Sequence, residues 1–160
     1  MLFNPKVSVC IITFNHEDYI TACLESILYQ QTDFDFEIII GDDFSTDGTR
    51  EIIEDYRIKF PNKIRILLQS YNTSGHKNYI DVHNAAVGTA VCHCDGDDLF
   101  RPGKLQQQYD FLVKNPEFSV VWTKADIFSD CGIRFDGSRS AYAMLQDGVI
   151  DLETSLMFGS

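Results

Sequence analysis

The sequence has neither a hydrophobic run long enough to cross a membrane nor a basic segment. Its 160 residues contain no apolar stretch near the roughly 18 residues that a membrane-spanning helix needs. Residues 1–6 lack the charged and then hydrophobic pattern of a signal peptide. Lys and Arg number 13 against 24 Asp and Glu, which gives a net charge of −11, and no basic stripe is present that could contact nucleic-acid phosphates. We therefore predict a protein that binds no nucleic acid and has no transmembrane segment. The cysteines indicate a reducing compartment, so we expect the cytoplasm, either free or at the inner face of the membrane.

The five cysteines do not form the framework of a disulfide-rich protein. Their number is odd and their spacing irregular, and three of them lie in apolar, strand-like segments where a reduced cysteine acts as a small hydrophobic residue. Cys92-His93-Cys94 has residue types that bind zinc, but in a strand Cys92 and Cys94 point to one face and His93 to the other. No second Cys or His pair follows, so we expect these cysteines to pack in the core.

Apolar, strand-like segments alternate along the chain with segments of helical periodicity. Strands are expected at 7–13, 36–41, 64–68, 90–94 and 118–123, with 126–129 extending or pairing with the last. Helices are expected at 17–31, 49–60, 78–87 and 102–114, and residues 148–158 have some helical character. Asn15 is a candidate N-cap for the first helix and Gly88 a candidate C-cap for the third. The alternation predicts a single α/β domain, 1–160, with a mostly parallel open sheet and helices on both faces.

Three carboxylates follow the strand expected at 90–94. Asp95, Asp97 and Asp98 lie within four positions, with Gly96 among them and Pro102 after them. Ligands of open α/β sheets bind at the carboxyl ends of the strands, and neighbouring carboxylates repel one another unless a hard cation lies between them. Mg²⁺ or Mn²⁺ suits such a cluster and would allow an acidic chain to bind a phosphate-containing ligand. The alternative is a solvated loop in which Asp97 or Asp98 caps the following helix.

Two further loops are expected at the same edge of the sheet. Thr13-Phe14-Asn15 follows the first strand and Asp42-Asp43 follows the second. A carboxylate accepts hydrogen bonds from a base N–H or a ribose hydroxyl, and an aromatic ring such as Phe14 can stack on a base. The alternatives are an Asp42-Asp43 turn in which Asp47 or Thr46 caps the next helix, and a Phe14 ring buried in the core.

A turn-rich loop at 71–78 contains Lys77, which could contact phosphate or remain solvated. The aspartates could also belong to a phosphoryl-transfer site of the haloacid-dehalogenase type, where an Asp-x-Asp follows a buried strand. That interpretation leaves the loops after the first and second strands without a role.

Three motifs in a fixed order resemble the N-terminal half of a family 2 glycosyltransferase with the GT-A fold. They are VSVCIITFN at 7–15, EIIIGDDFSTDGT at 37–49 and CDGDDLFRPGKL at 94–105. They resemble the family's Ser-Val-x-x-x-Thr-Tyr-Asn opening, its Val-Asp-Asp-x-Ser-x-Asp-x-Thr loop and its Asp-x-Asp-Asp metal motif. The resemblance implies a Rossmann-like nucleotide-binding half, a nucleotide-diphosphate sugar as donor, with a UDP-sugar favoured, and Mn²⁺ or Mg²⁺ as cofactor.

The resemblance also assigns roles to single residues. Phe14 stands where the family's Tyr lies against the base, and Asp43 stands where an Asp contacts the base. Lys77 roughly matches an Arg that faces the diphosphate, although the loop lengths differ. The metal ligands it implies are Asp98 and Asp97. The donor nucleotide-binding residues it implies are Thr13, Phe14, Asn15, Asp43, Lys77, Asp95 and Asp97.

By resemblance the reaction is an inverting sugar transfer to a hydroxyl of a saccharide or lipid-linked acceptor, in surface polysaccharide synthesis. The family's general base lies well downstream of the metal motif, so we expect it beyond Ser160 and expect the chain to be truncated on the acceptor side. Two other functions remain open at this point: a non-catalytic fragment that binds a nucleotide-sugar, and an Asp-x-Asp phosphatase or nucleotidyltransferase.

Overall fold

The computed structural model describes residues 4–123, 127–128 and 134–135. The chain divides into two compact units, residues 1–121 and 122–160. The elements of the first unit are β1 (Val7–Thr13), α1 (Ile20–Leu28), β2 (Phe36–Asp42), α2 (Thr49–Lys59), β3 (Ile64–Leu68), α3 (His76–Asn84), β4 (Ala90–Asp95) and α4 (Lys104–Lys114). The described elements of the second unit are β5 (Ile127–Phe128) and β6 (Arg134–Phe135), which pair antiparallel. No helix in the described part of the chain is long and apolar enough to span a membrane.

The first unit is built on a four-stranded parallel sheet in the order β3-β2-β1-β4. The strands β1 and β2 occupy the middle, and nearly all of their side chains are buried, as their runs of apolar residues on both faces predict. The register pairs Thr13 with Asp42 and Ile12 with Asp95. The carboxyl ends of β1, β2 and β4 are therefore level, which brings the loops that follow them to one edge of the sheet.

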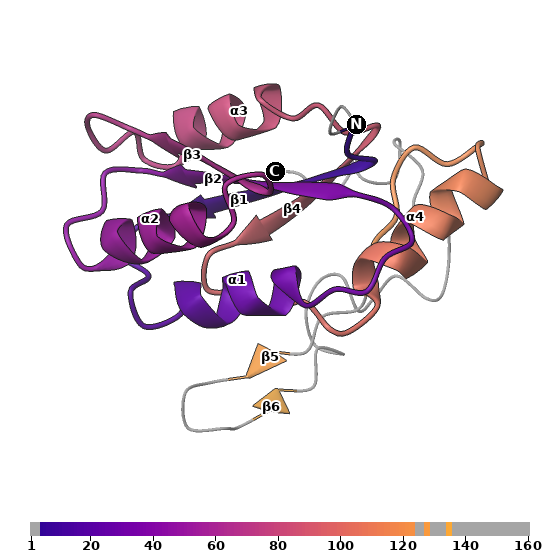
Figure 1. Ribbon diagram of the computed structural model, residues 1–160, viewed down its shortest axis with the longest axis horizontal. Coiled ribbons are helices and arrows are strands. Elements are labelled where there is room, and N and C mark those ends of the chain that lie inside the picture. The colour runs from indigo at the N-terminus through magenta and orange to yellow at the C-terminus, as the bar shows by residue number, and fades with distance from the viewer. Residues whose placement is uncertain (1–3, 124–126, 129–133, 136–160) are drawn as a thin grey trace. The chain divides into compact units, whose positions relative to one another are not determined.

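Helices cover both faces of this sheet (Figure 1), with α3 on one side and α1 and α2 on the other. Because side chains alternate along a strand, Val9 and Ile11 of β1 pack with the α1 and α2 side, while Cys10 packs against Val82 of α3. The larger core lies on the α1 and α2 side and also includes Leu105 of α4. The predicted α/β fold with a parallel sheet and helices on both faces is confirmed.

A buried polar network fixes the connection from α3 to β4 at the amino end of the sheet. Ser8 Oγ donates to the Glu37 carboxylate at 2.7 Å and accepts the Gly88 N–H at 2.8 Å, and Arg65 pairs with Glu37 at 3.1 Å. The prediction that Gly88 ends the third helix is wrong, because α3 ends at Asn84. A glycine is needed at position 88 for another reason: a Cβ there would lie 2.6 Å from the Ser8 nitrogen.

The structure differs from the prediction at the start of the first helix and at residues 118–123. The first helix begins at Ile20 rather than residue 17, and Asn15 does not cap it, because its side chain accepts the Thr46 N–H at 2.8 Å. Residues 118–123 are not a strand. The Phe118 N–H closes a turn onto the Asn115 carbonyl at 3.1 Å, and the Phe118 ring stacks on Phe111 of α4. A strand does form within 126–129, as β5, but it pairs with β6 and not with residues 118–123 as expected. Residues 148–158 lie outside the described residues.

The described cysteines are free thiols that pack as hydrophobic residues. Cys92 and Cys94 contact the larger core. Burial raises the pKa of Cys10 to about 12, and a hydrogen bond with Cys23 together with burial raises the pKa of Cys94. A cysteine binds zinc as a thiolate, so these environments favour the packing role over the zinc alternative.

Candidate functional site

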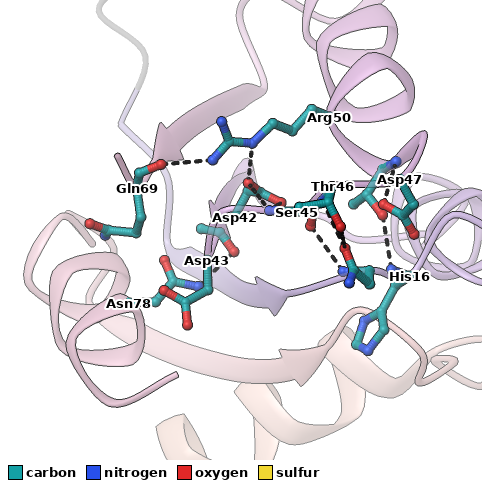
Figure 2. Close-up of polar contacts among 12 residues, drawn as sticks. His16, Asp42, Asp43, Ser45, Thr46, Asp47, Arg50, Gln69 and Asn78 are labelled. Carbon is teal, nitrogen blue, oxygen red and sulfur yellow. Dashed lines mark hydrogen bonds and ion pairs between the residues drawn. The ribbon is translucent and has the colours of Figure 1, made fainter. Parts of the chain in front are cut away.

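A cleft of about 500 Å³ opens at the carboxyl ends of β1, β2 and β4. Of the residues predicted to form a site, those that line it are Thr13, Phe14, Asp43, Asp95 and Asp97. Phe14 directly follows β1, Asp43 follows β2, and Asp95 ends β4. The parallel register therefore gathers residues from three distant parts of the sequence into one cavity. Figure 2 shows the loops at the ends of β1 and β2.

Asp43 is 2 % exposed, and its carboxylate holds one wall of the cleft in place. Its Oδ1 accepts the N–H and the hydroxyl of Thr73 at 2.8 and 2.5 Å, and its Oδ2 accepts the Gly75 N–H at 2.7 Å. Ser74, between these two residues, has a left-handed backbone with φ of 58°. The loop before α3 is thus folded back onto the end of β2 through this one side chain.

The neighbouring Asp42 has a different role. It is the last residue of β2, is fully buried, and pairs with the Arg50 guanidinium of α2 (Figure 2). Arg50 also donates to the Gln69 carbonyl at 2.7 Å, and Asp42 accepts the Ser45 N–H at 3.1 Å. Asp42 therefore ties the loop after β2 to the end of β3 and is not part of the cleft lining.

Three of the predicted residues, Asn15, Lys77 and Asp98, lie outside the cleft lining. Asn15 has a left-handed backbone with φ of 54°, and both its backbone N–H and its side chain contact the loop after β2. Lys77 is exposed, and its ammonium group pairs with Asp81 one helical turn further along α3. In this arrangement Asn15 shapes the loops and Lys77 is engaged on the helix surface.

Two carboxylates of the acidic cluster, Asp95 and Asp97, line the cleft. A hydrogen bond from His93 Nε2 at 3.2 Å lowers the pKa of Asp95. Partial burial, with the nearby charges of Asp95 and Asp97, raises the pKa of Asp98. Ionised carboxylates this close destabilise one another, and a bound cation would remove that cost.

The described residues contain no group of three or more His, Cys, Asp or Glu side chains placed to hold a metal ion by themselves. Mg²⁺ and Mn²⁺ sites need fewer protein ligands, because these ions keep several waters and bind substrate phosphate alongside one or two carboxylates. Asp97 and Asp98 are exposed, and Asp97 lines the cleft while Asp98 is the next residue along the chain. Their donor type and their crowding fit an ion of that kind.

Several lining residues were not predicted from the sequence. They are His16, Asn72, Ser74, Gly75 and Asn78, together with Ile12. The turn-rich segment at 71–78 indicated a loop there, but only the contacts to Asp43 show that it closes over this edge of the sheet. Asn78 is 1 % exposed, and its amide donates to the Gly41 carbonyl at 2.8 Å. No sequence signal pointed to His16.

Comparison with known proteins connects this geometry to one family. Residues 8–148 match the family model for glycosyl transferase family 2. The chain is 31% identical over 156 residues to the putative glycosyltransferase EpsE of Bacillus subtilis, covering 98% of this chain and 55% of EpsE. It is 36% identical over 129 residues to the uncharacterized protein Rv1520 of Mycobacterium tuberculosis, covering 80% of this chain and 37% of Rv1520.

Among solved structures, the chain is similar to residues 1–349 of S. aureus TarS in complex with UDP. The sequence identity is 32%, the TM-score is 0.62, and the match covers 69% of this chain and 33% of TarS 1–349. The same TarS fragment has also been solved with UDP-GlcNAc. The present chain thus spans between about a third and about a half of these three chains.

Proposed function

Because this chain belongs to glycosyl transferase family 2, we propose that it forms the donor-binding part of a metal-dependent, inverting glycosyltransferase. The donor is a nucleotide-diphosphate sugar, with a UDP-sugar as the first candidate, and the acceptor is a hydroxyl group of a saccharide or a lipid-linked saccharide. The cleft at the ends of β1, β2 and β4 carries the proposal, because it combines an exposed aromatic ring, buried polar groups and a carboxylate cluster.

The base of the nucleotide is assigned to the β2 side of the cleft. The Phe14 ring is 41 % exposed and lines the cleft, so it offers a face for stacking. Asp43 lies beside it and fixes the loop that carries Asn72 and Ser74 into the cleft wall. The similarity to TarS, which has been solved with UDP, supports uracil as the base.

The diphosphate is assigned to the β4 side, where Asp97 and Asp98 would hold Mn²⁺ or Mg²⁺. Such an ion, when bound, offsets the negative charge of the chain and stabilises the charge that develops on the leaving diphosphate. Asp95, fixed by His93, supports the ribose or the donor sugar. The loops after β1 and β2 both take part in this arrangement. In the phosphatase alternative these two loops would have no role.

The acceptor side stays a prediction. A general base is needed to deprotonate the acceptor hydroxyl, and no residue of the proposed donor site is assigned that role. The late carboxylates Asp147, Asp151 and Glu153 lie outside the described residues. A role in surface polysaccharide synthesis and a cytoplasmic location are part of the same proposal.

Titration calorimetry of the 160-residue chain with UDP, GDP and dTDP tests the donor site. We expect UDP to bind in the presence of Mn²⁺, binding to weaken when EDTA is added, and Asp98→Ala to lower the affinity by roughly tenfold or more. Asp55→Ala is the matched control, because Asp55 is exposed on α2 and outside the cleft. A folded chain that binds none of the three nucleotides would contradict the proposal.

A further inference from the structure

Two histidines and a tyrosine form a cluster of rings that joins α3 to β4. Tyr79 and His83 lie one helical turn apart on α3, and their rings stack with 3.9 Å between centroids. The His93 ring of β4 packs against both, with its centroid 5.1 Å from that of Tyr79 and 5.2 Å from that of His83. None of the three residues lines the cleft, so any effect on the site has to pass through a neighbour.

The alternation of side chains along β4 places His93 in this cluster. Cys92 and Cys94 contact the larger core on the α1 and α2 side. His93 lies between them in the sequence and therefore faces the side of the sheet that α3 covers (Figure 1). Asp95 follows two residues later, on the same face as His93, and ends β4 at the cleft.

His93 donates a hydrogen bond to the first carboxylate of the acidic cluster. Its Nε2 lies 3.2 Å from Asp95 Oδ1, and an ionised carboxylate can only accept, so Nε2 carries the proton. The His93 side chain is 36 % exposed and that of Asp95 50 % exposed. A hydrogen bond this open to water holds a freely rotating side chain weakly. Packing against Tyr79 and His83 restricts the His93 ring, so the donor to Asp95 is held in place.

The His83 ring is held by the backbone of its own helix. Its Nδ1 lies 2.8 Å from the Tyr79 carbonyl oxygen, which accepts the Nδ1 proton. Helix α3 is therefore linked to the cleft lining in two places. Asp43 accepts the N–H of Gly75, directly before the helix, and the rings on α3 reach Asp95 through His93.

We propose that His93 is a positioning residue of the donor site, which acts by orienting the Asp95 carboxylate at the cleft, and that Tyr79 and His83 hold the His93 ring in place. This inference rests on the proposed function. A ligand that needs Asp95 in one orientation binds more tightly when that orientation exists before binding, because less conformational freedom is lost.

Calorimetry with UDP and Mn²⁺ tests the role of His93. His93→Leu removes the donor to Asp95, and we expect the dissociation constant for UDP to rise about threefold to fivefold, as for a partly exposed ionic hydrogen bond. His93→Gln keeps an N–H donor at a similar reach and should bind UDP nearly as tightly as the unmodified chain. Val91→Leu is the matched control, because Val91 lies on the same face of β4 and outside the cleft lining, and it should leave the affinity unchanged.

A double-mutant cycle shows whether His93 acts through Asp95. In an Asp95→Ala background no carboxylate is left to orient, so His93→Leu should lower the affinity no further. A purely structural role of His93 would instead lower the affinity equally with and without the Asp95 side chain. By the same reasoning, His83→Leu should weaken UDP binding in the unmodified chain but not in the His93→Leu variant.

The outcomes separate this inference from the proposed function. The inference alone is overturned by a folded His93→Leu variant that binds UDP as tightly as the unmodified chain. Equal losses from His93→Leu in the two backgrounds overturn it as well, and so does a His93→Gln variant as weak as His93→Leu. An unmodified chain that does not bind UDP overturns the proposed donor site and this inference with it. Circular dichroism melts establish that each variant is folded.

Discussion

Asp43 and Asp42 are adjacent carboxylates with different partners and different roles. Asp42 faces α2 and pairs with Arg50, whereas Asp43 accepts three hydrogen bonds from Thr73 and Gly75 in the loop before α3. Hydrogen bonds to a charged acceptor are stronger than those between neutral groups. The position of the loop that closes the cleft therefore depends on one ionised side chain.

Asp43→Asn should loosen that loop. An amide can accept from Thr73 only by turning its NH₂ group toward the Gly75 N–H, which leaves two donors facing each other. We expect the affinity for UDP with Mn²⁺ to fall roughly tenfold and the unfolding free energy to fall by about 1–3 kcal/mol. Calorimetry measures the first effect, urea denaturation the second, and hydrogen exchange at the Gly75 amide reports on the loop directly.

Asp35→Asn is the matched control for that experiment. Asp35 is exposed and immediately precedes β2, so it lies at the opposite end of the strand that Asp43 follows. Its substitution should change neither quantity measurably. If Asp43→Asn leaves both the affinity and the exchange rate of the Gly75 amide unchanged, the carboxylate does not hold the loop.

At the scale of elements, α3 approaches β2 closely because residue 41 is a glycine. A Cβ at position 41 would overlap with Val82 Cγ2 and with the Asn78 side-chain amide, both on α3. The Asn78 amide donates to the Gly41 carbonyl across this contact. Gly75 lines the cleft and directly precedes α3. A shift of α3 away from the sheet would therefore also move this wall of the cleft.

Gly41→Ala should therefore displace α3 and lower both the stability of the chain and its affinity for the donor nucleotide. We expect a loss of about 1–3 kcal/mol in unfolding free energy, typical of an overpacked interface, and weaker UDP binding. Gly48→Ala is the control, because the atom that its Cβ would approach within 2.8 Å is the end of the exposed Glu17 side chain. If the two substitutions lower stability and UDP affinity equally, the close packing of α3 at Gly41 is not the cause of the losses.

The whole chain carries a net charge of −11. The carboxylates at the cleft add to that field at the place where an anionic donor is proposed to bind. Self-repulsion of this kind destabilises the compact state, and dissolved salt screens it. The same field explains why a divalent cation belongs to the proposed donor site.

Thermal stability should therefore rise with salt at neutral pH. Between about 50 and about 500 mM NaCl we expect Tm at pH 7 to increase by about 2–4 °C, which corresponds to about 1 kcal/mol for a chain of this size. The control is the same pair of measurements near pH 4.6, the pI of the sequence, where the net charge vanishes. A salt response of equal size at both pH values would mean that self-repulsion is not its cause.

Much of the fold could be predicted because its signals are local. The buried strands are continuous apolar runs, and the covering helices repeat apolar residues every three or four positions. The predicted strand at 118–123 failed for a non-local reason. Its β-branched and aromatic residues fit a strand, but a strand needs a hydrogen-bonded neighbour, and a turn closed by Asn115 and Phe118 forms instead.

The predicted residues that line the cleft either end a strand or follow its end within two residues. Thr13, Asp43 and Asp95 reach the cleft because parallel strands in register end at one edge. Asn15 and Lys77 have the right chemistry in the right segments, but nearby partners engage their side chains elsewhere. His16 and Asn78 were missed because no local pattern marks them, and they line the cleft only once the sheet and α3 are in place.

The alternation of strands and helices, the family motifs and the acidic edge of the sheet could all be predicted from the sequence alone. Hydrophobic periodicity and short motifs carry that information within a few residues of each position. Only the tertiary structure decided which carboxylate of the Asp42-Asp43 pair reaches the cleft and where the loop before α3 closes. Those outcomes depend on hydrogen bonds between residues some thirty positions apart, and such bonds exist only once the parallel sheet has brought the strand ends together.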